Sequence, residues 1–477
     1  MIMEREKEVR LHEAADVVVA GAGIAGSFAA IAAARHGAKT VLADRFGAMG
    51  GNIGPALLPA GTLLGGSGYA AEDSVLGGFA GLSLEFRRRV EALNRDEPMH
   101  AQSFTTSYVL GEMAREAGVE WLPSAYAADP VMDGSAVTGL FVETCGGRVA
   151  IAAKVVVDAT GEASIAARAG APMIRHTPAD PSWGRMVSRQ MNDLQYAWWN
   201  DTHLLVMVAG VDWARFESCQ KESAALSYED ERWAAQYWAK DIPRRLVPAA
   251  RRAFEQEGFR IHGDIEAKVP TYVSPLADMG AGVVSYRVGA RGQIDCDDAA
   301  QMARIENFVR RQGYRFYAFM KRECPGFERA FVVGMSSFLG MRGGPCIDGE
   351  HVLTVEEQRD GARFDDALYR NVHAIWAHGA AASGFDVPYR CLLPRRIDGL
   401  LVAGRGAAFI RRGHDPSAMR ARVSMMVLGE AAGAAAAMAA AAGVAPRKLD
   451  VKQLQRRLVA AGFSLGPPER LRELGLT

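Results

Sequence analysis

The segment Asp16–Asp44 (DVVVAGAGIAGSFAAIAAARHGAKTVLAD) most constrains what this chain can fold into. Three valines precede Gly21, Gly23 and Gly26, which are spaced as G-x-G-x-x-G, and an alanine-rich stretch, a second apolar run and an acid follow. In this pattern the first glycine permits a tight strand-to-helix turn, the second lets backbone approach a pyrophosphate, and the third allows close helix–strand packing. The segment therefore predicts a β-α-β unit that binds a dinucleotide.

The acidic residue at the end of the β-α-β unit limits which dinucleotides can bind. Asp44 follows the apolar run Thr40–Ala43, where a carboxylate can accept hydrogen bonds from the hydroxyls of a ribose. An acid at this position disfavours a 2′-phosphate, so this motif leaves NAD and FAD open. Because glycine triplets also occur in ordinary turns, the order of strand, helix, strand and acid supports the prediction more than the glycines alone.

Composition excludes several classes of protein. The 477 residues suit up to about three domains. The 55 basic residues equal the 55 acidic residues, which argues against a general binder of nucleic acid or of anionic membranes. The charged N-terminal stretch MIMEREKEVRLHEAA lacks the apolar core of a secretory signal, and the apolar tract Ala431–Ala442 is too short to span a membrane. We expect a soluble, cytoplasmic protein with no membrane span.

The six cysteines are far apart in the sequence and form no C-x-x-C pair. This spacing favours isolated reduced thiols over a disulfide-reductase centre or an iron–sulfur cluster. We expect no metal site.

The pattern of apolar and small residues predicts regular elements after the first unit. A glycine-rich passage, 45–68, is suited to backbone that lies against a flat ligand or in a packed turn. The predicted elements are helices over Leu82–Asn94 and Thr105–Ala117, followed by strands around Glu120–Ala127, Val137–Glu143 and Arg148–Asp158.

Composition changes after Pro172, where aromatic residues cluster and a long mixed-charge helix is predicted over Arg304–Lys321. The small-residue style returns near His373, with a strand in Leu400–Arg405. A helix over Ser417–Ala441 follows, in which Gly429 and Gly433 permit close packing, and an amphipathic helix is expected over Asp450–Ala461. We interpret 1–172 as the first part of a nucleotide-binding domain, 173–370 as an inserted substrate or cap domain, 371–445 as the second part of the first domain, and 446–477 as a helical tail.

Three separated motifs share one resemblance. Gly21–Gly26 with Asp44, the run Val157–Glu162 (VDATGE) and the run Leu400–Arg405 (LLVAGR) together resemble the FAD-dependent oxidoreductase family. That family is allied to the flavoproteins of fumarate reductase and succinate dehydrogenase. The resemblance implies an α/β fold: a Rossmann-like FAD-binding domain of glutathione-reductase type with an inserted α+β substrate or cap domain. It also implies FAD as the cofactor.

The resemblance assigns cofactor contacts residue by residue. The first glycines would hold the pyrophosphate, the acid after the second strand the adenosine ribose, and the start of the last long helix the flavin ring. The expected cofactor-binding residues are Gly21, Ala22, Gly23, Ile24, Ala25, Gly26, Asp44, Arg45, Gly50, Gly51, Ala127, Thr160, Gly161, Gly404, Arg405, Met419 and Arg420.

The same motif map indicates which polar residues lie near the reactive side of the flavin. They are His378, His414, Arg342 and Tyr389, which we take as candidate acid–base or substrate-orienting groups. Many relatives carry an Arg-acid-hydroxyl-Arg run where this chain has Met341–Pro345 (MRGGP), and only the first arginine of that run is kept.

The expected function is transfer of a hydride between a small organic substrate and flavin N5. The electron acceptor is left open among oxygen, a quinone, a protein and a nicotinamide nucleotide. Two alternatives are a flavoprotein subunit of a larger electron-transfer complex and an FAD-dependent RNA-modifying protein. Zero net charge counts against the second, so no nucleic-acid partner is expected, while a homo-oligomer is left open.

Overall fold

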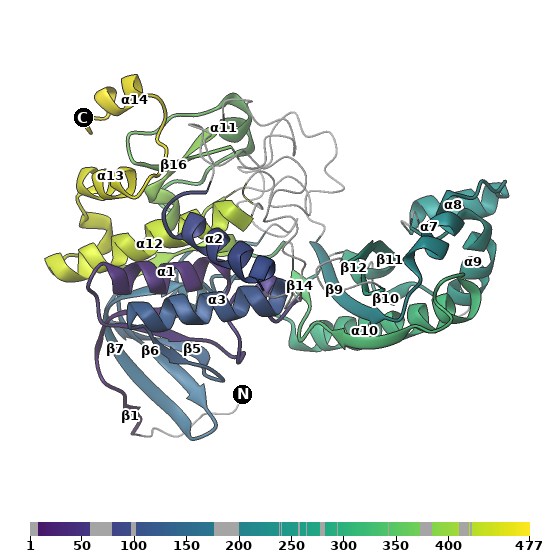
Figure 1. Cartoon of the computed structure of the whole chain (residues 1–477). Coiled ribbons are helices and arrows are strands. Elements are labelled where there is room, and N and C mark those ends of the chain that lie inside the picture. The colour runs from purple at the N-terminus through teal and green to yellow at the C-terminus, as the bar shows by residue number, and fades with distance from the viewer. Residues whose placement is uncertain are drawn as a thin grey trace.

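The chain folds into two lobes, each with its own hydrophobic core (Figure 1). We call the described residues within 8–175 and 343–477 the first lobe, and those within 200–341 the second lobe. The computed structural model describes residues 8–57, 79–96, 102–175, 200–237, 239, 241–255, 258–263, 265–276, 282–292, 294–341, 343–372, 384–409, 419 and 422–477.

A mixed sheet forms the centre of the first lobe. Its parallel part has the order β4-β3-β2-β7, with β18 paired to the other side of β7. β2, β3 and β18 consist of apolar residues with few exceptions because both faces of this part of the sheet are buried. β6 pairs antiparallel with the first half of β7, and β5 pairs antiparallel with β6. The strands are β1 (Arg10–Leu11), β2 (Ala15–Ala20), β3 (Thr40–Ala43), β4 (Glu120–Leu122), β5 (Tyr126–Asp133), β6 (Ala136–Thr144), β7 (Gly147–Asp158) and β18 (Leu400–Val402).

The expected strand around Glu120–Ala127 is in fact two strands, β4 and β5. Ser124, between them, has a left-handed backbone with φ of 54°, which turns the chain away from the direction of β4. The other elements expected before Pro172 are confirmed.

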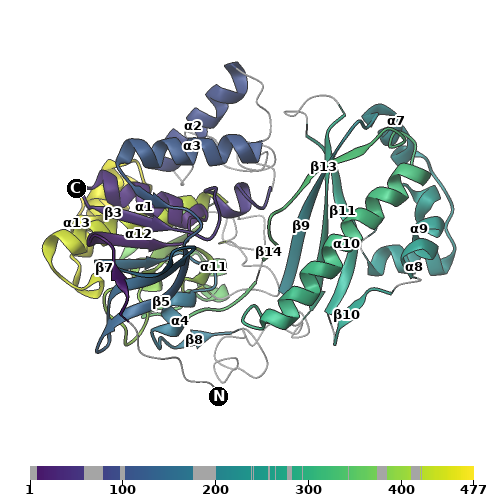
Figure 2. The same ribbon diagram turned by 90° about the horizontal axis from the view of Figure 1, so that it is seen from below.

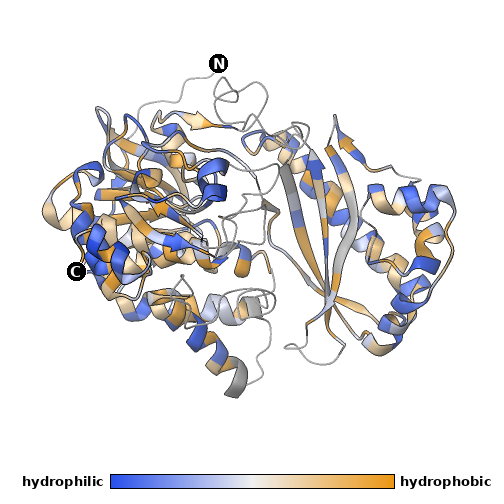
Figure 3. Cartoon of the chain, turned by 90° about the horizontal axis from the view of Figure 1, so that it is seen from above, coloured by the Kyte–Doolittle hydropathy of each residue, from blue (hydrophilic) through white to orange (hydrophobic). Residues whose placement is uncertain are grey.

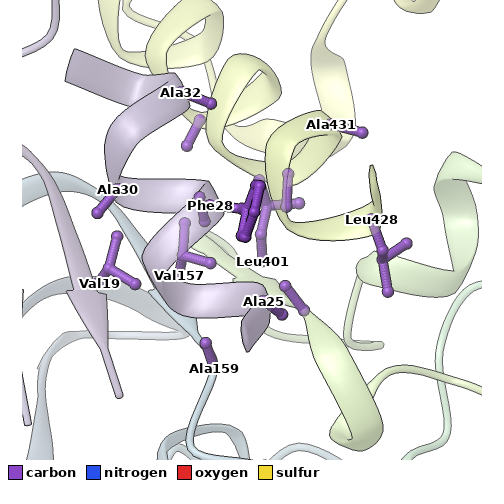
Figure 4. Packing of buried hydrophobic residues seen from close by; sticks show 14 of the residues in the cluster. Val19, Ala25, Phe28, Ala30, Ala32, Val157, Ala159, Leu401, Leu428 and Ala431 are labelled. Atoms are coloured by element: carbon purple, nitrogen blue, oxygen red, sulfur yellow. The ribbon is translucent and has the colours of Figure 1, made fainter. Parts of the chain in front are cut away.

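Helices α1 (Ile24–Arg35) and α12 (Arg422–Ala442) pack against each other, and both contact the parallel sheet. Figure 4 shows Phe28 of α1 among the packed residues of this core, with Val19 and Val157 on the sheet side. Of the most apolar window of α12, 83% is buried inside the molecule. This helix is long and apolar enough to cross a membrane, but here it serves as a core helix.

The two helices approach each other to backbone contact. A Cβ added to Gly429 would lie 2.2 Å from the carbonyl oxygen of Ala25, and one on Gly433 would lie 2.0 Å from that of Ala29. The close packing expected at these glycines is therefore confirmed, and it fixes α12 against the helix that follows the glycine fingerprint.

Shorter elements complete the first lobe. Helices α2 and α3 lie beside α1, and the C-terminal helices pack on the outside of α12 and β16 (Figure 1). The remaining elements are α2 (Gly81–Asp96), α3 (Gln102–Ala117), η1 (Gly51–Ile53), α4 (Ser164–Arg168), β8 (Met173–Ile174) paired with β15 (Cys346–Ile347), α11 (Val355–Asp360), β16 (Ala367–Asn371) paired with β17 (Phe385–Pro388), η5 (Tyr389–Leu392), η6 (Gly404–Gly406), η8 (Pro446–Lys448), α13 (Val451–Ala460) and α14 (Pro468–Glu473).

The second lobe is an antiparallel sheet of order β10-β11-β12-β9-β13, covered on one face by the long helix α10 (Figure 2). Its strands are largely apolar, whereas the helices at its outer end carry many hydrophilic residues (Figure 3). The elements are β9 (Asn200–Ala209), α7 (Trp213–Lys221), α8 (Tyr228–Gln236), η3 (Arg244–Leu246), α9 (Val247–Glu255), β10 (Arg260–His262), β11 (Ile265–Pro275), β12 (Val284–Gly292), α10 (Ala299–Glu323), β13 (Phe331–Met335) and β14 (Gly340–Met341), which pairs with β9.

The segment after η1 joins the two lobes. The hydroxyl of Ser336 donates a hydrogen bond to the carbonyl oxygen of Ala56 over 2.7 Å. Leu57 packs with Leu205 and Met207 of β9 in a small apolar cluster. The second sheet is thereby anchored on the loop that adjoins the glycine fingerprint.

A buried carboxylate links α12 to the start of α2 and makes stability depend on pH. Glu430 accepts a hydrogen bond from the backbone N–H of Leu82 over 2.9 Å, and burial raises its pKa from 4.5 to about 8. The folded chain therefore holds a proton that the unfolded chain releases near pH 4.5. We expect the free energy of unfolding to fall by a few kcal/mol as pH rises from 5 to 8. Glu430→Gln should remove this loss, so that it is more stable than the natural protein at pH 8 in thermal unfolding; an equal pH dependence in both would contradict the prediction.

Candidate functional site

The separated sequence motifs meet at one edge of the first sheet. β2, β3, β7 and β18 run parallel, so their carboxyl ends lie together. The residues that follow these ends include Gly21, Asp44, Ala159 and Gly404, and all four line one cavity of about 1210 Å³. Ligands of open α/β sheets bind at this edge. Residues of the second lobe form the opposite wall of the cavity.

The three glycines of the G-x-G-x-x-G fingerprint have different structural roles. Gly21 has φ of 97°, and a Cβ on Gly26 would lie only 1.8 Å from the carbonyl oxygen of Gly21, so both are required by the chain itself. A Cβ on Gly23 would have no atom of the described residues within 4 Å. Gly23 thus leaves an open space at the N-terminus of α1, where unpaired N–H groups favour a phosphate. The residues present fit a pyrophosphate at this place.

Asp44 is held by backbone at the wall of the cavity. Its Oδ2 accepts from the N–H of Ala22 over 2.6 Å and its Oδ1 accepts from that of Phe46 over 2.7 Å. Burial raises the pKa of this carboxyl, and the two N–H donors act in the opposite direction. The carboxylate is fixed at the end of β3, as the ribose contact requires.

Asp158, at the end of β7, organises the next loop. Its Oδ1 accepts from the N–H and the hydroxyl of Thr160, over 3.1 and 2.7 Å, and its Oδ2 accepts from the N–H groups of Ile165 and Ala166, each over 2.9 Å. Burial raises the pKa of Asp158 while these hydrogen bonds lower it. This residue was quoted in the sequence motif without a role. The signal for its role was an acid at a strand end just before a helix start, which is typical of a cap.

An ion pair between Arg405 and Glu162 lies in the same cavity. A Cβ on Gly344, which has φ of 125°, would come 2.5 Å from Nη1 of Arg405, so only glycine leaves room for this guanidinium. Cys296 of the second lobe also lines the cavity, and burial raises the pKa of its thiol to about 12. Like the other five cysteines it is a free thiol, and it stays protonated at neutral pH.

Most of the expected cofactor residues surround this cavity. Ala22, Gly26 and Gly50 lie just behind its wall, where Gly50 N–H donates to the carbonyl oxygen of Ala22 over 2.8 Å. Arg420 lies outside the described residues. The expected residues that line the cavity are Gly21, Gly23, Ile24, Ala25, Asp44, Arg45, Gly51, Ala127, Thr160, Gly161, Gly404, Arg405 and Met419. That they contact the cofactor stays a prediction.

None of the four residues expected at the reactive side of the flavin is found lining the cavity among the described residues. His378, His414 and Arg342 lie outside the described residues, and their roles stay predictions. Tyr389 is buried in the core of the first lobe, and its hydroxyl donates to the carbonyl oxygen of Pro446 over 3.0 Å. It does not line the cavity. Tyr389 therefore has a structural role, and its expected place beside the substrate is wrong, because η5 turns the ring toward the core.

Sequence reasoning missed the residues that the second lobe contributes. His203 on β9 and Arg287 on β12 line the cavity together with Met302 and Phe338. Phe338 stacks on Phe46 of the first lobe with ring centroids 4.6 Å apart. His203 and Arg287 are polar residues within largely apolar strands, and this was the only sequence signal for them. The signal does not show a functional role unless it is known which face of the sheet meets the first lobe.

Comparison with known proteins identifies the family. Residues 16–458 match the family described as FAD dependent oxidoreductase. This chain belongs to that family. FAD is its cofactor, and the expected α/β fold, a Rossmann-like FAD-binding domain with a further domain, is confirmed. It is an enzyme of the flavin-dependent oxidoreductases.

Three solved structures with a similar fold are distant from this chain in sequence. A geranylgeranyl bacteriochlorophyll reductase-like protein from Thermoplasma acidophilum is 13% identical, with a TM-score of 0.43 over 97% of this chain and 86% of that one. The p-nitrophenol 4-monooxygenase from Pseudomonas putida is 12% identical, with a TM-score of 0.41 over 98% and 93%. A flavoprotein/dehydrogenase from Cytophaga hutchinsonii is 12% identical, with a TM-score of 0.39 over 93% and 83%. No curated protein matches the sequence.

Proposed function

We propose that this flavoprotein transfers a hydride between a small organic substrate and N5 of its flavin. One observation supports this most: a single cavity extends from the fingerprint of the first lobe to side chains on the sheet of the second lobe. Such a cavity has room for a cofactor and for a molecule beside it. When bound, FAD supplies the two-electron redox chemistry, and the chain supplies binding, orientation and proton transfer.

The residues of the first lobe would hold the cofactor. The space at Gly23 and the N-terminus of α1 suits the pyrophosphate, and Asp44 suits the adenosine ribose. Arg422, the first residue of α12, and Met419, three residues before it, line the cavity and would lie at the flavin end. The positive end of the α12 dipole would favour negative charge on the reduced ring.

Proton transfer requires a group that titrates near neutral pH. A hydride leaving a carbon that bears O–H or N–H needs a base, and a hydride added to an alkene needs an acid. His378 and His414 are proposed for this task, with Arg342 orienting the substrate. Histidine suits it because its ordinary pKa lies near 6.5. The narrower kinship with fumarate reductase flavoproteins and the cytoplasmic location remain sequence-based proposals.

The test is the visible spectrum of the purified protein and its response to candidate substrates under anaerobic conditions. We expect a yellow protein whose flavin absorbance is bleached by an organic substrate. A colourless protein that cannot be reconstituted with FAD would contradict the proposal, and bleaching by NADH alone would make the chain an NADH-dependent reductase.

Two variants test the proton-transfer residues. His378→Ala and His414→Ala should each slow flavin reduction by about 100-fold or more while keeping bound FAD, since general acid–base catalysis contributes about 10²–10⁴-fold. Reduction at the natural rate in both variants would remove these histidines from the mechanism.

A further inference from the structure

The two lobes meet near Asp44 through a pair of stacked aromatic rings. Phe46 lies two residues after Asp44 in the first lobe, and Phe338 follows β13 in the second lobe. Their ring centroids are 4.6 Å apart and their planes differ by 20°. Both residues line the cavity, so this contact between the lobes belongs to the wall of the cofactor site.

The guanidinium of Arg45 lies against this aromatic pair. Its central carbon is 4.8 Å from the centroid of the Phe46 ring and 5.8 Å from that of the Phe338 ring, and both distances are within the range of a cation–π interaction. Arg45 is exposed and lines the cavity. One of the two rings that hold its charged group therefore comes from the second lobe.

The aromatic pair is also connected to the carboxylate of Asp44. The backbone N–H of Phe46 donates to Oδ1 of Asp44 over 2.7 Å, so the residue that carries one ring also fixes the group expected at the ribose. Burial raises the pKa of the Asp44 carboxyl, and the nearby charge of Arg45 acts in the opposite direction. The carboxylate, the guanidinium and the two rings thus form one connected group.

The segment that carries Phe338 is held on the first lobe by its backbone as well. The N–H of Ser337 donates to the carbonyl oxygen of Pro55 over 3.0 Å, and the hydroxyl of Ser336 donates to that of Ala56. The Oγ of Ser336 also accepts from a backbone N–H of β9 over 2.8 Å, which fixes it to the second sheet. The ring of Phe338 therefore reaches the cavity from a segment with hydrogen bonds to both lobes.

Holding Arg45 in advance favours a ligand that uses its guanidinium. An unrestrained arginine side chain has many rotamers, and binding a ligand costs the entropy of choosing one of them. Two aromatic rings restrict the side chain before the ligand arrives, so less entropy is lost on binding. A guanidinium binds phosphate and also stacks on flat rings. The adenosine diphosphate half of FAD offers both kinds of group.

We propose that Phe338 is a positioning residue of the FAD site and that it acts through Arg45. Together with Phe46 it holds the guanidinium of Arg45 beside Asp44, where the guanidinium binds the adenosine diphosphate half of the cofactor. The second lobe, which the sequence predicted as a substrate or cap domain, is then part of the cofactor site. This role concerns cofactor affinity, so it does not depend on the proposed hydride transfer.

The test measures the affinity of the apoprotein for FAD and for ADP. FAD is titrated into the apoprotein with and without ADP, and flavin fluorescence gives both dissociation constants. Phe338→Ala should raise both by the same factor, about 5- to 50-fold, because it removes an aromatic pair and a cation–π contact that serve only the adenosine half. Phe338→Leu keeps the apolar bulk and should lose less affinity, and it replaces the alanine variant if that variant does not fold. Phe331→Ala removes an exposed phenylalanine of β13 and should change neither constant.

A double variant tests the route through Arg45. Arg45→Met should weaken the binding of FAD and of ADP to a similar extent. Phe338→Ala combined with Arg45→Met should bind little more weakly than Arg45→Met alone, since both changes remove the same contact. Losses of affinity that add in full would overturn the route through Arg45.

Three other results would overturn the inference as a whole. Natural affinity in both Phe338 variants would mean that the ring only joins the lobes. A larger loss for FAD than for ADP in Phe338→Ala would mean that the change disturbs the whole cavity, and a natural protein on which ADP does not compete with FAD would have no such contact. Substrate-dependent reduction of the flavin, which tests the proposed function, is unaffected by any of these results.

Discussion

Gly23→Ala is expected to weaken FAD binding by about 10- to 100-fold and to leave the stability of the apoprotein nearly unchanged. Gly23 has φ of −66°, which alanine adopts without strain, and its added methyl would meet no atom of the described residues within 4 Å. The methyl would instead enter the space into which the pyrophosphate must come. Overpacking by a methyl group costs about 1–3 kcal/mol, which corresponds to this loss of affinity.

Two further glycines give the matched controls. Gly111 on α3 also has open space around its missing side chain, but it lies away from the cavity. Gly111→Ala should keep FAD affinity and raise the free energy of unfolding by about 0.5–1 kcal/mol. Gly26→Ala should destabilise the fold, since its Cβ would lie 1.8 Å from a carbonyl oxygen. FAD titration of the apoprotein and thermal unfolding measure both effects. Natural FAD affinity in Gly23→Ala, or its unfolding, would contradict the assignment.

The motifs predicted the cofactor half of the site because each one marks the end of a strand. Gly21, Asp44, Thr160 and Gly404 follow strands that turn out to be parallel neighbours, so a sequence-based list of strand ends became one edge of a sheet. The apolar runs that precede them are local signals. The pairing itself is not local, and the double use of β7, which pairs with β6 in its first half and with β2 in its second, has no marker in the sequence.

Residues whose role depends on the direction in which the side chain points could not be predicted in the same way. Tyr389 was expected beside the flavin from the motif map, but it lies in η5 with its ring in the core. His203 and Arg287 were missed for the opposite reason. Their common face follows from the register of β9 with β12, and its orientation follows from the contact of Leu205 with Leu57. Neither of these is encoded within one segment.

Asp386→Ala is expected to lower the free energy of unfolding by about 3–5 kcal/mol. Asp386 is fully buried on β17, and its carboxylate lies 3.0 Å from Nη1 of Arg370, 3.6 Å from the guanidinium of Arg363 and 3.8 Å from that of Arg470. Arg370 is itself 1% exposed. Removing the carboxylate leaves this guanidinium buried without its counterion, and it also removes one of the contacts of Arg470 on α14.

Chemical unfolding of the FAD-loaded protein measures this loss of stability, and two other variants serve as controls. Asp360→Ala removes the carboxylate of an exposed pair with Arg359 and should leave the free energy of unfolding nearly unchanged. Asp386→Leu combined with Arg370→Met should recover much of the loss, because it removes the buried guanidinium that Asp386→Ala leaves without a counterion. If Asp386→Ala instead unfolds like Asp360→Ala, the three arginines do not depend on this carboxylate, and the C-terminal helix is held by its apolar contacts and by the hydrogen bond from Arg470 to the carbonyl oxygen of Phe364.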